Sequence, residues 1–102
     1  MIHVIATIST KSGRRADFLD EFRRLVPLVL AEDGCIDYGP ATDIDSGMPG
    51  QPAGRNDVVT VIEKWENVPA LEAHLAAPHM LSYKERVKDI VVGVEIRVLQ
   101  PE

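Results

Sequence analysis

Hydrophobic and polar positions divide the chain into stretches of two kinds. In the first kind, apolar residues alternate with polar ones or form short β-branched runs, which predicts β-strands. Four strands are expected, at residues 2–9, 35–43 and 57–66 and through Val94, Ile96 and Val98. Glycine and proline recur between residues 46 and 56, which predicts a loop.

In the second kind, apolar residues recur at steps of three and four, the spacing of one helix face. Helices are predicted over about 14–32, 68–76 and 79–91. Pro27 interrupts the first pattern and is expected to kink this helix or to cost it a hydrogen bond. Gly34 suits the C-terminal cap of the first helix, Asn67 suits the N-cap of the second, and Pro78 separates the second from the third.

The predicted order is β-α-β-β-α-β, in which the two later helices together form the second α segment. It predicts a ferredoxin-like α+β fold in one domain over residues 1–102, with helices on one face of a four-stranded antiparallel sheet. In the strand at 57–66, both faces are largely apolar near the middle. A sheet face left to solvent should be polar. A second copy of the chain is therefore expected to cover the free face, which would make a homodimeric α+β barrel.

Composition narrows the classes of partner. The formal net charge of −5 argues against nucleic acid and anionic membrane surfaces. No stretch approaches the roughly 18 apolar residues of a membrane span, and the N-terminus lacks the pattern of a signal peptide. The single cysteine, Cys35, cannot form an internal disulfide, which fits a reducing compartment. The cytoplasm is the expected location.

Six side chains are candidates for chemistry at one end of this fold. They are Tyr38, Glu63, Trp65, His74, His79 and Tyr83. Glu63 and Trp65 share a strand face. They are either a rim glutamate and a core tryptophan, or a pocket wall whose carboxyl has a raised pKa and can move protons. His74 borders the apolar stripe of its helix, where a packed, hydrogen-bonded histidine is the commoner role and a proton acceptor is the alternative.

The other candidates also have two interpretations. His79 and Tyr83 are four residues apart and are expected to share a helix face, as a surface pair or in a pocket. Tyr38 belongs either to the core or to the same pocket. Together, the six suit a flat aromatic ligand with hydroxyl groups. His74 and His79 lack the spacing of a helical metal pair, and no nucleotide, phosphate or zinc motif is present, so neither a metal nor a cofactor is expected.

Three short blocks resemble the antibiotic biosynthesis monooxygenase family. Glu32-Asp33-Gly34-Cys35 resembles its Glu-Pro/Glu-Gly-Cys element, and Glu63-Lys64-Trp65-Glu66 resembles its Glu-x-Trp strand end. The run from Leu71 to Met80 resembles its Leu-x-x-His-Leu-x-x-Pro-His block. The likeness covers nearly the whole chain and is strongest to the bacterial quinol monooxygenases that act on reduced naphthoquinones.

This resemblance implies a dimeric barrel that oxidises a quinol-type substrate with O₂ to the quinone, without flavin, haem or metal. On this basis His74 is expected to be the base, and Glu63 to orient a histidine or to relay the proton. The substrate is expected to contact Trp65, His79, Tyr83 and Tyr38. Two alternatives remain open: a dimeric small-molecule-binding module without turnover, and an isomerase of a small hydroxylated carbonyl compound.

Overall fold

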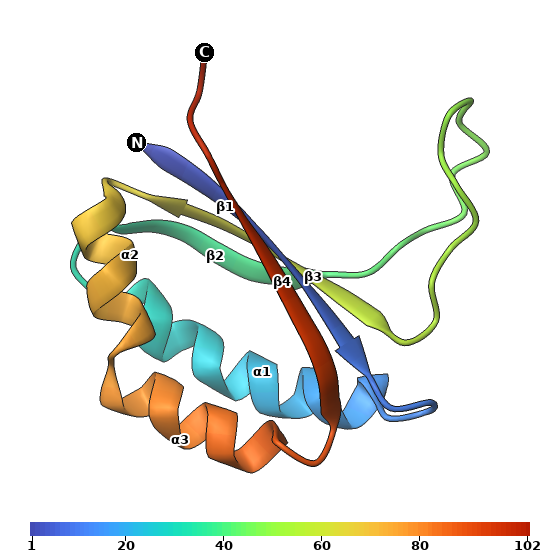
Figure 1. The fold of residues 1–102 in the computed structure, drawn as a ribbon, viewed down its shortest axis with the longest axis horizontal. Helices are drawn as coiled ribbons and strands as arrows, with labels where there is room; N and C mark the ends of the chain where they lie inside the picture. The colour runs from blue at the N-terminus through green and yellow to red at the C-terminus, as the bar shows by residue number, and fades with distance from the viewer.

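A computed structural model describes all 102 residues as a four-stranded sheet with three helices (Figure 1). The elements are β1 (Ile2–Thr10), α1 (Arg15–Leu30), β2 (Cys35–Ala41), β3 (Val58–Trp65), α2 (Val68–Leu75), α3 (Pro78–Val87) and β4 (Val91–Leu99). The strand order is β2-β3-β1-β4, and every neighbouring pair is antiparallel. The predicted ferredoxin-like α+β fold is confirmed.

The helix ends differ from the prediction. α1 begins at Arg15 and ends at Leu30, and it continues through Pro27, which lies on the exposed side of the helix. α3 ends at Val87, so its predicted extension to residue 91 is wrong. The chain turns after Val87 instead, and the N–H of Ile90 donates a 2.9 Å hydrogen bond to the Val87 carbonyl. Ile90 is still buried in the hydrophobic core, although it lies in this turn and not on a helix face.

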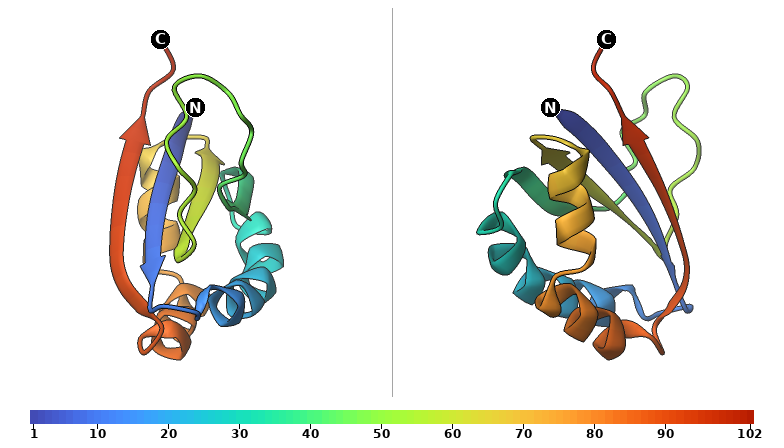
Figure 2. Two further views of the ribbon diagram at one scale, coloured as in Figure 1. Left: turned by 90° about the vertical axis from the view of Figure 1, so that its right-hand side faces the viewer. Right: turned by 60° about the vertical axis from the view of Figure 1, so that its left-hand side comes forward.

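The three helices gather on one side of the sheet, as the right-hand panel of Figure 2 shows. Alternate residues of β1 and β3 point toward them and are buried. An aromatic cluster fills the space between the layers. It comprises Phe18 and Phe22 of α1, Tyr38 of β2 and Tyr83 of α3, with neighbouring ring centroids 5.4–6.1 Å apart. These rings tie both long helices to the sheet.

The outer strand β4 is less covered than the others. Five of its six apolar residues are at least two-fifths exposed, namely Val92, Val94, Ile96, Val98 and Leu99, whereas Val91 is partly buried against the core. The segment between β2 and β3 projects away from the layers, and the two chain ends lie at one end of the molecule (Figures 1 and 2). None of the helices has the length and apolar character needed to cross a membrane.

Candidate functional site

The C-terminal end of β3 carries Glu63 and Trp65 into the interior. They lie on the same face, as the alternation predicts, and both are buried. In the sheet register, Glu63 lies between Tyr38 of β2 and Val4 of β1. The indole N–H of Trp65 donates a 2.9 Å hydrogen bond to Oε1 of Glu63. The second carboxyl oxygen of Glu63 is left without a partner in the protein.

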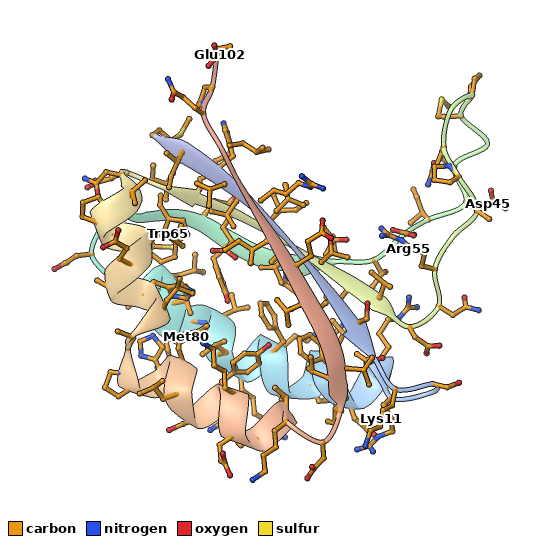
Figure 3. All side chains as sticks on the ribbon, viewed as in Figure 1. Lys11, Asp45, Arg55, Trp65, Met80 and Glu102 are labelled. Atoms are coloured by element: carbon orange, nitrogen blue, oxygen red, sulfur yellow. The ribbon has the colours of Figure 1, made fainter.

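A cavity of about 400 Å³ lies between this face of the sheet and helices α2 and α3. It has 17 lining residues, of which 13 are hydrophobic. The lining residues with polar groups are Tyr38, Glu63, His74, Tyr83, Lys84 and Lys88. Met80, at the start of α3, contributes to the same wall, whereas Asp45 and Arg55 lie on the projecting segment away from it (Figure 3). An apolar cavity with a few hydrogen-bonding groups suits a small aromatic molecule.

One carboxylate oxygen connects the two histidines of the α2–α3 region. Oε2 of Glu32 lies 2.9 Å from Nδ1 of His74 and 2.7 Å from Nε2 of His79. Nε2 of His74 has no partner in the protein. No side-chain nitrogen or oxygen is both fully buried and without a partner, so Nε2 of His74 retains some exposure, and His74 is one of the residues that line the cavity.

The turn after α1 positions Glu32 for these contacts. Gly34 has a φ of +82°, a conformation that glycine adopts without strain. A Cβ at Gly34 would lie only 2.6 Å from Cβ of Ala70, so the turn packs directly against α2. α2 itself starts at Asn67, whose side chain accepts a 2.9 Å hydrogen bond from the backbone N–H of Ala70, the cap predicted from the sequence. This close approach brings Glu32 to His74 on the following turn of α2.

Burial changes the acidity of the groups around the cavity. It raises the pKa of Glu63 to about 7; the hydrogen bond from Trp65 opposes this shift, and the nearby Glu32 adds to it. Burial lowers the pKa of His74, and the hydrogen bond and charge of Glu32 oppose that change. Burial also raises the pKa values of Tyr38 and Tyr83, with Glu63 acting in the same direction. Both tyrosines are therefore neutral hydroxyl donors at pH 7.

Four of the six candidate side chains from the sequence meet on the wall of one cavity. They are Tyr38, Glu63, His74 and Tyr83. Trp65 and His79 are not among the residues that line the cavity. Trp65 is fully buried, with its ring centroid 4.7 Å from that of His74. Nε2 of His79 is directed at Glu32.

Glu32 had no role predicted from the sequence, although it begins the Glu32-Asp33-Gly34-Cys35 block that resembles the family. Glu32 is separated from His74 by 42 residues and from His79 by 47, so no periodicity connects them. The only local signal is Gly34, which marks a tight turn two residues later. Lys84 and Lys88 were also missed, since lysines on a helix usually mark a solvated face. No group of three or more His, Cys, Asp or Glu side chains is arranged to hold a metal ion.

Known proteins match this chain over most of its length. Residues 1–86 match the family described as Antibiotic biosynthesis monooxygenase. The Escherichia coli (strain K12) protein named "Probable quinol monooxygenase YgiN" is 45% identical over 103 aligned positions, which cover 99% of this chain and 98% of that protein.

Two solved structures have the same fold. PA3566 from Pseudomonas aeruginosa has a TM-score of 0.81 at 27% identity, covering 99% of this chain and 93% of that one. A conserved protein from Methanosarcina mazei Go1 has a TM-score of 0.83 at 22% identity, covering 99% and 92% of the two chains.

Proposed function

The chain belongs to the antibiotic biosynthesis monooxygenase family, and on that premise we propose that it oxidises a quinol-type aromatic substrate with O₂ to the quinone without a cofactor. One observation carries the proposal: a buried histidine that lines an apolar cavity has one ring nitrogen without a hydrogen-bond partner in the protein. That nitrogen is Nε2 of His74. The name of the E. coli relative supports a quinol as the substrate class.

The cavity wall suits a quinol. Thirteen hydrophobic residues would surround a flat ring, and the volume of about 400 Å³ is toward the low end of small-ligand sites. The hydroxyls of Tyr38 and Tyr83 have no hydrogen-bond partner in the protein, so both are available to the oxygens of a substrate. The free oxygen of Glu63 is a third such group.

Proton removal is the step that the protein is proposed to assist. A phenolic hydroxyl has a pKa near 10 in water and is mostly protonated at pH 7. Nε2 of His74 takes this proton, and the bonding electron pair stays on the substrate oxygen. The resulting anion is electron-rich and passes electrons to O₂. Overall, the quinol loses two electrons and two protons, O₂ gains them as hydrogen peroxide, and the quinone remains.

The other candidate residues are proposed to support this step. Glu63, with a pKa of about 7, is suited to exchange a proton with the second substrate oxygen near neutral pH. Trp65 acts through its hydrogen bond to Glu63 and its contact with His74, in place of the direct stacking expected from the sequence. His79 acts through Glu32 in place of a direct bond to the substrate. The proposed location is the cytoplasm, where a lone cysteine stays reduced.

A homodimer is part of the proposal. The free face of the sheet carries half-exposed apolar residues such as Ile62, and the edge strand β4 exposes further apolar side chains, of which Val94 and Ile96 lie on the cavity side. Exposed apolar surface on a sheet face and at a sheet edge is typical of an interaction site. A second copy would bury this surface as a barrel-forming partner.

Oxygen uptake tests the function directly. The purified protein is mixed with a panel of reduced naphthoquinones and benzoquinones, with and without a chelator, and the rate without protein is subtracted. We expect chelator-resistant O₂ uptake that falls in a His74→Gln variant. Uptake no faster than the rate without protein would reject the enzyme and favour the binding module, and equal uptake in both proteins would reject His74 as the base. Conversion of a small hydroxylated ketone in place of O₂ uptake would favour the isomerase.

A further inference from the structure

The structure points to Glu32 as the positioning residue for His74: we propose that its carboxylate fixes which nitrogen of His74 carries a proton and which one accepts the proton of the substrate. The role of Glu32 in turnover rests on the proposed function, whereas the position of the proton on the ring of His74 does not. The inference is based on one oxygen of Glu32, Oε2, which lies within 3 Å of Nδ1 of His74 and of Nε2 of His79.

The arrangement follows from what a carboxylate can do. An ionised carboxylate only accepts hydrogen bonds, so both ring nitrogens that face Oε2 must carry protons. Nδ1 of His74 is therefore the N–H of the neutral ring, and Nε2 retains its lone pair. Without Glu32, neutral imidazole would place its proton on either nitrogen. The tautomer with N–H at Nε2 would present a donor to the cavity and could not accept the proton of the substrate.

The fold holds Glu32 in place from several sides. Its backbone N–H donates a 2.9 Å hydrogen bond to the carbonyl of Val29, and its own carbonyl accepts a bond of 3.2 Å from the N–H of Cys35. His79 holds the carboxylate from the solvent side at 2.7 Å. The exposed fraction rises from 2% for the side chain of His74 to 13% for Glu32 and 25% for His79. The pair next to the cavity is thus shielded from water, where charge interactions are strong.

The charge of Glu32 also matters after proton transfer. When Nε2 of His74 takes the substrate proton, the ring becomes a cation facing the carboxylate at 2.9 Å. Other titratable groups surround the ring from each packed element. They are Tyr38 on β2, Glu63 on β3, and His79, Tyr83 and Lys84 on α3. Lys84 disfavours the cation, and Glu63 is only partly ionised near pH 7, so Glu32 is the main stabilising charge.

The test combines nitrogen-15 NMR of the histidine rings with kinetics of Glu32→Gln. Glutamine keeps the shape of the side chain and removes its charge. Asp33→Asn is the matched control, because it removes the same charge from the neighbouring exposed residue. We expect His74 in the parent protein to carry its proton on Nδ1 at neutral pH, and to titrate at lower pH in Glu32→Gln.

The same variant should change turnover in a specific way. We expect kcat to fall by roughly tenfold or more in Glu32→Gln, and the rising limb of its pH profile to move to lower pH, since the lost carboxylate no longer favours protonated His74. Asp33→Asn should match the parent in kcat and in the pH profile. A parent His74 protonated on Nε2, or a Glu32→Gln profile equal to that of Asp33→Asn, would overturn the inference. If the parent has no quinol turnover, the proposed function fails, and the NMR titration alone decides the role of Glu32.

Discussion

Glu63 offers a test of the electrostatics that is independent of any substrate. Its side chain is 6% exposed, and burial raises its pKa from 4.5 to about 7. The folded state therefore holds a proton that the unfolded state releases between pH 4.5 and 7. Stability falls as pH rises through this window, because there the folded state binds more protons than the unfolded state. Each pKa unit corresponds to about 1.4 kcal/mol, so ionising Glu63 costs the fold about 3 kcal/mol by pH 8.

Glu63→Gln should remove this cost. The amide oxygen of glutamine can still accept the hydrogen bond from Trp65, and the amide stays neutral at every pH. We expect parent and variant to be equally stable near pH 5, where the parent carboxyl is protonated. At pH 8 the variant should be more stable by up to about 3 kcal/mol, which corresponds to about 1–3 M in the urea midpoint.

The assay is urea unfolding at pH 5 and pH 8, at one fixed protein concentration, because dimerisation would make stability depend on concentration. Glu72→Gln, which changes an exposed carboxyl on α2 and keeps Glu63, is the control and should match the stability of the parent at both pH values. A Glu63→Gln variant whose advantage is the same at pH 5 and pH 8 would refute the argument. So would a variant that is less stable than the parent at pH 8.

Three further outcomes are expected. His74→Gln should lower quinol turnover by roughly 10²-fold, measured as O₂ uptake, with an unchanged far-UV circular dichroism spectrum. Gly34→Ala should destabilise the fold by at least ~1–2 kcal/mol in urea unfolding, because alanine is strained at a φ of +82° and its Cβ would collide with Ala70. Light scattering after gel filtration should give an even multiple of 11.2 kDa, and a stable monomer would contradict the dimer.

The sequence was most informative where local periodicity decides structure. Alternation placed Glu63 and Trp65 on one strand face, and the cap at Asn67 was correct, because both depend on neighbours along the chain. The end of α3 was mispredicted, since Ile90 continues the apolar spacing but meets the core from a turn. The complete burial of Trp65 could not be read from spacing, because a strand pattern gives the face of a residue and not its depth.

The contact between Glu32 and the two histidines is a second feature that the sequence could not predict. It depends on a left-handed glycine, on the close packing of the α1–β2 turn against α2, and on the break between α2 and α3 that brings His79 back toward the turn. Each feature has a local signal, but their convergence on one oxygen is a property of the tertiary structure. A family block can mark Glu32 as part of a pattern, whereas only the fold shows what it contacts.

The two carboxyl groups near His74 have different surroundings. One oxygen of Glu32 lies within hydrogen-bond distance of ring nitrogens from both histidines. Glu63 is deeper, receives only the indole N–H, and has a pKa near 7. Sites that combine acid and base steps commonly use environment to separate titratable groups in this way. In the proposed mechanism, the carboxylate of Glu32 favours protonated His74, while Glu63 exchanges a proton with the substrate. We therefore expect removal of Glu32 to weaken His74 as the proposed base, and removal of Glu63 to change the pH range of turnover without changing the tautomer of His74.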